Sequence, residues 1–114
     1  MAFHCELTAE DGIQWLGLHG RLDSATSSDL EQTITPLFAA PGGGVVMDFA
    51  DLAYISSAGL RVVLMAAKRA KQSGGRLMLC ALSANVREVF EISGFLKILE
   101  VVSDRPAAHS ALAG

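Results

Sequence analysis

The chain has 114 residues, of which 51% are hydrophobic and 18% are charged, and its formal net charge at pH 7 is −3. This length suits one domain, and this composition is typical of a globular protein rather than a disordered one. The acidic balance excludes the basic surface that direct nucleic-acid binding requires, and charged residues interrupt the apolar runs before any reaches the length of a membrane span. The first residues lack a secretory signal pattern, so we expect a small cytoplasmic protein.

Two N-terminal strands are expected to form a hairpin. Residues 3–8 alternate between apolar and polar side chains, and residues 13–19 follow an Asp-Gly turn. Each strand contains one histidine, His4 in the first and His19 in the second, and neither has a second ligand at the spacing of a metal site. We therefore expect two structural histidines, no metal ion and no cofactor.

A polar run and then a helical apolar pattern follow the hairpin. Residues 24–29 are rich in serine and aspartate, which favour a helix start, and apolar residues recur at helical spacing up to Phe38. Pro36 is expected to kink this helix or divide it in two. The Pro-Gly-Gly-Gly run at residues 41–44 ends it, and because no Gly-Lys-Ser/Thr follows, we interpret the run as a turn rather than a phosphate loop.

The stretch around residue 50 predicts a central strand followed by a helix. Residues 45–49 are nearly all apolar, as in a strand covered on both faces, and a tight acidic turn is expected after them. An amphipathic helix then begins at Ser56 and Ser57. Its buried face is expected to hold Leu60, Val63, Leu64 and Ala67. Met65 falls on the opposite, mostly polar face with Arg61, either as an ordinary exposed methionine or as part of a contact surface.

The C-terminal third predicts two more strands and a short helix. A strand is expected over residues 76–82, a helix over residues 83–93 with its first serine as the cap, and a last strand ending by residue 102. Residues 104–114 are rich in alanine and could form a final helix or a frayed tail. The element order β-β-α-β-α-β-α-β predicts a single α/β domain, with an ordered core over residues 3–103 and a central mixed sheet flanked by helices.

The side chains that could carry chemistry do not form a catalytic pattern. The Ser-Ser-Ala-Gly at residues 56–59 differs from the Gly-x-Ser-x-Gly elbow of hydrolases. Asp48 ends a central strand as a phospho-accepting aspartate would, but the acidic pair and the lysine that this chemistry needs are missing from the other strand ends. Cys5 and Cys80 lie far apart in apolar strands, which indicates reduced, buried thiols. We therefore expect a protein that is not an enzyme.

Three segments of the chain, taken together and in order, form a recognisable pattern. They are Gly-Arg-Leu-Asp at residues 20–23, residues 45–49 followed by Tyr-Ile-Ser-Ser-Ala-Gly-Leu-Arg at residues 54–61, and Ser-Gly-Phe at residues 93–95. The pattern resembles the signature of STAS domains, which are named for sulphate transporters and anti-sigma factor antagonists. The second segment is similar to the central motif of the family, the first resembles its Gly-x-Leu-Asp before the first helix, and the third resembles its late Ser-Gly-aliphatic turn. The resemblance implies a central sheet flanked by helices, in agreement with the element order.

The resemblance also implies a phosphorylation site. In stand-alone bacterial members, the serine of an Asp-Ser-Ser/Thr-Gly-Leu pattern is phosphorylated. Aligning on Gly59 places Ser57 at that serine and leaves Ser56, the second choice, where the family has aspartate. Asp23 matches the acidic residue near the phosphorylated serine, and Asp51 is also expected near it. The residues expected to contact the partner are Ser56, Ala58, Leu60, Arg61 and Met65.

The function implied is that of an anti-sigma factor antagonist. The partner in such systems is an anti-sigma factor that is itself an ATP-binding serine kinase with a histidine-kinase-like fold, and a PP2C-type phosphatase reverses the mark. The unmodified domain would bind the kinase and free the sigma factor, and the phosphate would release it, because the added charge must be desolvated at a packed interface.

Two alternatives to this switch remain open. The chain could be a non-switching STAS subunit of a larger assembly, such as a lipid-transport complex or a stress-signalling scaffold, with Ser57 only as a helix cap. It could instead be a small-ligand sensor with a pocket near the same loop.

Overall fold

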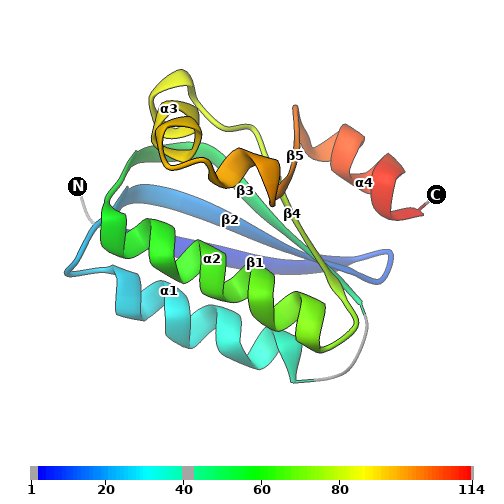
Figure 1. Ribbon diagram of the computed structural model, residues 1–114. Helices are drawn as coiled ribbons and strands as arrows, with labels where there is room; N and C mark the ends of the chain where they lie inside the picture. The colour runs from blue at the N-terminus through cyan, green and yellow to red at the C-terminus, as the bar shows by residue number, and fades with distance from the viewer. Residues whose placement is uncertain (1–2, 40–42, 114) are drawn as a thin grey trace.

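The helices and strands of the chain alternate as an α/β protein, and the computed structural model describes residues 3–39 and 43–113 (Figure 1). The strands are β1 (His4–Glu10), β2 (Ile13–Leu22), β3 (Gly44–Ile55), β4 (Arg76–Cys80) and β5 (Glu100–Val102). The helices are α1 (Ser27–Ile34), α2 (Ser57–Gln72), α3 (Ala84–Ile92) and α4 (Arg105–Ala113), with short 3-10 helices η1 (Thr35–Phe38) and η2 (Phe95–Lys97). No helix within the described ranges is long and apolar enough to cross a membrane.

The five strands form one mixed sheet in the order β1-β2-β3-β4-β5. β1 pairs with β2 in antiparallel fashion, and the pairs β2–β3, β3–β4 and β4–β5 are parallel. The hairpin turns at Asp11 and Gly12, whose positive φ angles of 55° and 76° are those that an Asp-Gly turn favours. Helical segments connect the parallel strands, as parallel pairing requires. The predicted fold class is confirmed.

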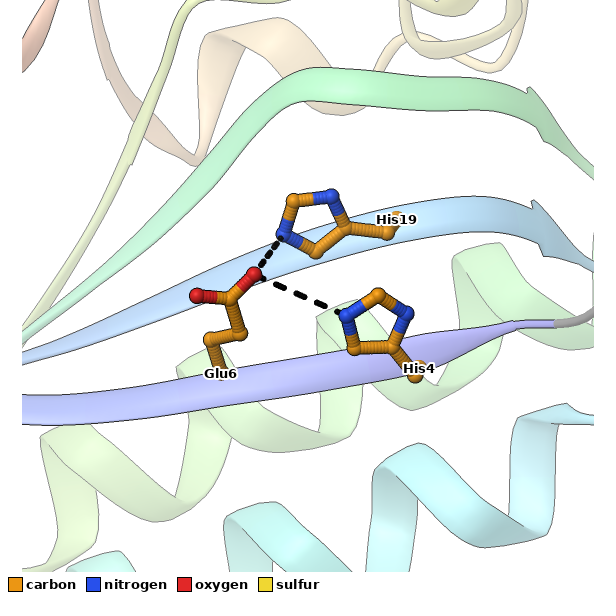
Figure 2. Close-up of side chains that lie close together, drawn as sticks. All are labelled: His4, Glu6 and His19. Atoms are coloured by element: carbon orange, nitrogen blue, oxygen red, sulfur yellow. Dashed lines mark ion pairs between the residues drawn. The ribbon is translucent and has the colours of Figure 1, made fainter.

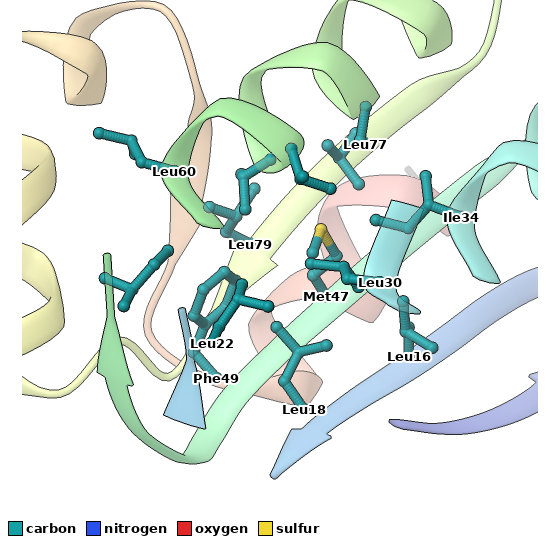
Figure 3. Packing of buried hydrophobic residues seen from close by; sticks show 14 of the residues in the cluster. Leu16, Leu18, Leu22, Leu30, Ile34, Met47, Phe49, Leu60, Leu77 and Leu79 are labelled. Carbon is teal, nitrogen blue, oxygen red and sulfur yellow. The ribbon is translucent and has the colours of Figure 1, made fainter. Parts of the chain in front are cut away.

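Helices cover both faces of the sheet. Figure 1 shows α1 and α2 side by side along one face, and side chains of α3 belong to the same core cluster. Figure 3 shows this cluster at close range, with strand residues packed against α1 and α2. Its labelled members are Leu16, Leu18, Leu22, Leu30, Ile34, Met47, Phe49, Leu60, Leu77 and Leu79. On the opposite face, Ala108 of α4 packs against a smaller cluster that includes Trp15 and Met78. The sheet therefore separates two surfaces of the molecule.

Strand β3 extends further than its sequence predicts. The tight acidic turn expected after residue 49 is wrong, because residues 50–55 continue the strand beside β2. Leu52 and Ile55 are buried, whereas the two residues between them are exposed, so this half does not alternate with a period of two. The register with β2 also shifts twice, between Gly17 and His19 and between Gly20 and Arg21. Such irregularities arise from the pairing of two strands and leave no local signal.

The expectations at the helices are largely confirmed. Pro36 divides the first helix as expected, because α1 ends at Ile34 and the 3-10 helix η1 continues to Phe38. Ser83 accepts a hydrogen bond from the Val86 N–H (3.2 Å) and so caps α3. The C-terminal segment forms a helix, α4, rather than a frayed tail. Of the expected turn over residues 41–44, positions 41 and 42 lie outside the described residues.

The buried face of α2 differs from the expected one. Leu60 and Val63 are buried as expected, but Leu64 and Ala67 are only half-buried. Met65, which was expected on the polar face, is half-buried and packs against the core. The buried residues of the helix are Gly59, Leu60, Val62, Val63, Ala66 and Ala70. Several of these side chains are small and let the helix backbone approach its neighbours closely, a feature that a pattern of large apolar residues cannot reveal.

Candidate functional site

The start of α2 lies directly after the end of β3, and Ser56 is its N-cap. Ser56 has extended backbone angles (φ −95°, ψ 175°), and its Oγ accepts a hydrogen bond from the Gly59 N–H at 3.2 Å. Its carbonyl accepts the first helical hydrogen bond, from the Leu60 N–H at 2.9 Å. Ser56 is half-buried, and its hydroxyl oxygen is engaged in capping.

Ser57 occupies a different position from its neighbour. It is the first residue of α2 and is exposed, so the reading of Ser57 as the helix cap is wrong. Its side chain projects from the turn in which backbone N–H groups lack helical partners and the helix dipole is positive. The first turn of α2 contains no acidic residue. A group with negative charge on Ser57 would therefore meet a favourable local potential.

Gly59 holds this helix start close to the end of β2. A Cβ atom at Gly59 would lie 2.7 Å from Leu22 Cγ and 3.0 Å from the Leu22 carbonyl oxygen. The same carbonyl accepts a hydrogen bond from the Ser56 N–H at 2.8 Å. The strand end that leads into Asp23 therefore lies against the turn that leads into Ser57.

Asp23 organises the segment that begins α1. Its Oδ1 accepts hydrogen bonds from the N–H groups of Ala25 (3.0 Å) and Thr26 (3.2 Å) and from the Thr26 hydroxyl (3.2 Å). Desolvation pushes the pKa of Asp23 up, but these hydrogen bonds and the positive charge of Arg21 outweigh it and hold the pKa below the ordinary value of 3.8. Asp23 is thus a fixed negative charge at neutral pH on the segment beside the α2 start.

The other residues that were expected near Ser57 or at the partner contact differ in their burial and in their contacts. Asp51 lies in β3 opposite His19, with its Oδ2 3.4 Å from His19 Nδ1, and no hydrogen bond or ion pair joins it to the helix start within the described residues. Leu60 is only 7% exposed and belongs to the core, which corrects the expectation that it contacts a partner directly. Arg61 is exposed one turn beyond Ser57, and Ala58 is half-buried.

A cation–π pair beside this site was not expected. The guanidinium carbon of Arg21 lies 4.2 Å from the centroid of the Tyr54 ring, and both side chains are exposed. The two residues are partners across β2 and β3, one position before the strand ends at Leu22 and Ile55. They offer a flat, partly apolar surface of the kind that protein interfaces use. Only the register between the two strands, which contains a shift at this point, brings them together.

The histidines and the cysteines match their expected surroundings only in part. His4 and His19 do not stand alone: their rings stack at 4.4 Å with an interplanar angle of 5°. Cys80 is buried and Cys5 is half-buried, and both are free thiols. Desolvation and the charge of Asp48 raise the pKa of Cys80 to about 11, and desolvation and the charge of Asp29 do the same for Cys5. Both thiols are therefore protonated at neutral pH.

The known proteins that are similar to this chain agree with one another. The family model of the STAS domain matches residues 4–108. BtrV of Bordetella bronchiseptica, which carries the name of an anti-sigma factor antagonist, is 48% identical over 101 residues, which cover 89% of this chain and 87% of that protein. The crystal structure of an anti-sigma factor antagonist from Mycobacterium paratuberculosis superposes with a TM-score of 0.90 at 20% identity, over 99% of this chain and 96% of that one.

A third similar protein has been solved in two states. The Bacillus protein SpoIIAA in its phosphorylated form matches with a TM-score of 0.71 at 22% identity, over 96% of this chain and 99% of that one. At such identities the solved structures establish the fold alone. The family model, however, spans nearly the whole chain, and BtrV shares almost half of the aligned residues. The chain therefore belongs to the STAS domain family.

Proposed function

We propose that this protein is an anti-sigma factor antagonist whose binding to its anti-sigma factor is switched by phosphorylation of Ser57. The observation that carries the proposal is the division of roles between two adjacent serines. Ser56 caps α2 through its hydroxyl oxygen, whereas Ser57 is exposed at the first helical position. A kinase can therefore reach the Ser57 hydroxyl without first breaking the hydrogen bond that holds the helix start.

The charge distribution supports release of a partner rather than unfolding of the domain. A phosphate adds about −1.5 to −2 charge at pH 7. The α2 start can accommodate it through the helix dipole, and Arg61, four residues along the helix, lies on the same face for a charge-assisted hydrogen bond. A partner packed over Ser57 would have to desolvate that charge beside the negative Asp23 segment. The phosphate thus weakens the interface while the fold is retained.

The proposed partners follow from the relatives. BtrV bears the name of an anti-sigma factor antagonist, and SpoIIAA is described in unphosphorylated and phosphorylated forms. By analogy, the partner of this chain is an anti-sigma factor with serine kinase activity, a PP2C-type phosphatase restores the unmodified form, and the encounters occur in the cytoplasm. The domain itself is a regulatory binding module rather than an enzyme.

The contact surface we propose is the exposed side of the α2 start. It comprises Ser57 and Arg61, the accessible parts of Ser56, Ala58 and Met65, and the adjoining Arg21–Tyr54 pair. Leu60 supports this surface from below, because it is buried in the core.

A ligand sensor finds less support in the geometry. A hollow lined by Asp11, Gly44, Arg76 and His109 lies at the amino ends of β3 and β4, whereas Ser57 follows the carboxyl end of β3. A ligand in this hollow would bind at the opposite edge of the sheet from the serine site.

Incubation with ATP and an anti-sigma factor that has serine kinase activity tests the proposal. We expect the unmodified protein and Ser56→Asp to incorporate phosphate at equal rates, since aspartate caps a helix as well as serine does and removes the alternative hydroxyl. Ser57→Ala is expected to incorporate none, and mass spectrometry of the parent protein should place the phosphate on Ser57. Phosphate on Ser56, or incorporation into Ser57→Ala, would contradict the assignment.

A further inference from the structure

The antiparallel pairing of β1 and β2 gathers three side chains with metal-ligating atoms on one face of the sheet. His4 and His19 are directly opposite each other, and Glu6 is opposite Gly17. Because side chains alternate along a strand, Glu6 points to the same face as His4. Gly17 has no side chain between Glu6 and His19, and a Cβ there would lie 3.5 Å from His19 Nε2. The glycine therefore leaves open the space into which Glu6 and His19 converge.

The ligand atoms converge at a spacing that suits one small cation. Figure 2 shows the Glu6 carboxylate beside the two stacked imidazole rings, with one oxygen facing a nitrogen of each ring. Its Oε1 lies 2.9 Å from His19 Nε2 and 3.6 Å from His4 Nε2, and one ligand atom from each residue lies within 4.8 Å of the others. Zinc–ligand bonds of about 2.0–2.1 Å at tetrahedral angles separate neighbouring ligand atoms by about 3.3 Å. The two distances from Glu6 Oε1 bracket this value.

Asp51 on β3 completes the arrangement from behind His19. Its Oδ2 lies 3.4 Å from His19 Nδ1, the ring nitrogen on the side away from Glu6. In the metal-free chain the closer carboxylate is Glu6, at Nε2; when a metal ion replaces the proton there, the carboxylate of Asp51 holds the remaining proton on Nδ1, as in many histidine-ligated sites. The His19 side chain is 26% exposed, against 62% for His4 and 64% for Glu6. His19 is thus the fixed ligand, and the site is open to solvent on the other side.

A positive group, Arg105, also reaches the space above Gly17, where its Nη2 would lie 3.5 Å from a Cβ atom. Arg105 of α4 borders the same hollow, together with Glu6, His19 and Asp51. Its guanidinium is paired with Asp48, with its Nε 2.6 Å from Asp48 Oδ2. This pair offsets the charge of Arg105 and leaves the carboxylate of Glu6 paired with the two histidines.

We propose that His4, Glu6 and His19 form a binding site for a divalent transition-metal ion, with Zn²⁺ as the natural occupant. Two imidazole nitrogens and one carboxylate oxygen are ligands that Zn²⁺ prefers, whereas Mg²⁺ and Ca²⁺ require sites rich in oxygen. Three protein ligands leave the fourth tetrahedral position to water or to a donor from another molecule. The site lies on the face that α4 covers in part, opposite α1 and α2, and does not depend on the proposed function of Ser57.

Titration of the metal-free full chain with ZnCl₂ by calorimetry tests the site. We expect one Zn²⁺ per chain and no heat with MgCl₂. His19→Gln and Glu6→Gln should each weaken binding by at least about tenfold, and Asp51→Asn by about 10–100-fold, because it orients a ligand without touching the metal. The matched control is His109→Gln, which removes the third histidine of the chain from its contact with Asp11 and should leave Zn²⁺ affinity unchanged.

A spectroscopic readout separates metal ligation from loss of structure. Co²⁺ substitution should give the visible absorption of a four-coordinate site in the parent chain and in His109→Gln but not in His4→Gln, while circular dichroism shows all three folded. Absence of one-to-one Zn²⁺ binding in the parent chain would overturn the proposal. So would equal Zn²⁺ affinity of the parent, His19→Gln and Glu6→Gln, or loss of binding in His109→Gln.

Discussion

The two hydroxyls at the start of α2 differ in what they bond to, and this difference has a measurable consequence for stability. Ser56 Oγ accepts the Gly59 N–H, so Ser56→Ala should lower the free energy of unfolding by about 1 kcal/mol. Ser57 is exposed at the first helical position, so Ser57→Ala should change the free energy of unfolding by less than about 0.5 kcal/mol. Urea unfolding monitored by circular dichroism measures both, with Ser56→Asp as the control that keeps a capping oxygen. A larger loss for Ser57→Ala than for Ser56→Ala would reverse the roles.

The charge of Asp23 predicts a pH dependence of stability. Its pKa is lower in the folded protein than the ordinary value of 3.8, so ionised Asp23 contributes stability above that value. The contribution is lost as the pH falls through the lowered folded pKa. Asp23→Asn keeps an oxygen that can accept from Ala25 and Thr26 but removes the charge. We expect the mutant to be less stable than the parent near pH 6 and the difference in unfolding free energy to narrow as the pH falls below 3.8, measured by urea unfolding at each pH. A gap that does not vary with pH would contradict this.

At the scale of elements, the close docking of α2 on β2 depends on one missing side chain. Gly59→Ala would place a methyl 3.0 Å from the Leu22 carbonyl oxygen, a backbone atom with little freedom to move. We expect a loss of about 1–3 kcal/mol in unfolding free energy. The control is Gly44→Ala, whose new methyl would meet only the flexible end of Leu112, 3.2 Å away, and should cost much less. Similar losses for the two variants in chemical denaturation would show that the contact with Leu22 is not limiting.

Elements with strong local signals could be predicted from the sequence, and those that depend on pairing could not. The Asp-Gly turn specified the hairpin, and Pro36 specified the break after α1, because each acts on its own backbone. The second half of β3 and the Arg21–Tyr54 contact depend on a register that shifts between two strands. The stacking of His4 on His19 likewise follows from pairing, which is invisible when each histidine is considered in its own segment.

The candidate site was predictable in its position but not in its details. The Ser-Ser-Ala-Gly motif located the helix start correctly, because polar capping residues followed by a glycine and an apolar pattern have few other uses. Which serine is the cap depends on the first helical residue, and sequence patterns place such boundaries only to within a few residues. Leu60 was expected on the buried face of the helix and also at the partner contact, and its burial in the core agrees with the first expectation and leaves little side chain for the second.

For the whole molecule, the sheet separates two surfaces that can act independently. α1 and α2 lie on one face, with Ser57 at the carboxyl end of β3, and the His4–Glu6–His19 cluster lies on the face of α4. Under the proposed function, a phosphate on Ser57 would meet a helix start that is already suited to negative charge, so the fold would need no rearrangement for the switch. The consequence of the phosphate is therefore expected in binding rather than in the stability of the domain.

Two folded variants of Ser57 test that expectation directly. Ser57→Ala cannot be phosphorylated and should bind the anti-sigma kinase with the affinity of the unmodified protein, with or without ATP. Ser57→Asp places a carboxylate at the first turn of α2, where the dipole tolerates it, so the domain should stay folded by circular dichroism. Its affinity for the kinase should nevertheless fall by about tenfold or more. A tenfold loss corresponds to only about 1.4 kcal/mol of binding free energy, which an unmatched charge at the interface can supply.

Calorimetric titration of each variant with the kinase and a non-hydrolysable nucleotide gives the comparison, and Ser57→Asn serves as a neutral control of the same shape as aspartate. If the lost affinity of Ser57→Asp comes from charge, Ser57→Asn should bind the kinase nearly as well as Ser57→Ala. A higher salt concentration should then reduce the difference in affinity between Ser57→Asp and Ser57→Asn. If asparagine weakens binding as much as aspartate does, the effect is steric. Equal affinities for aspartate and alanine would mean that charge at Ser57 does not control the interface, and the chain would then act as a non-switching subunit.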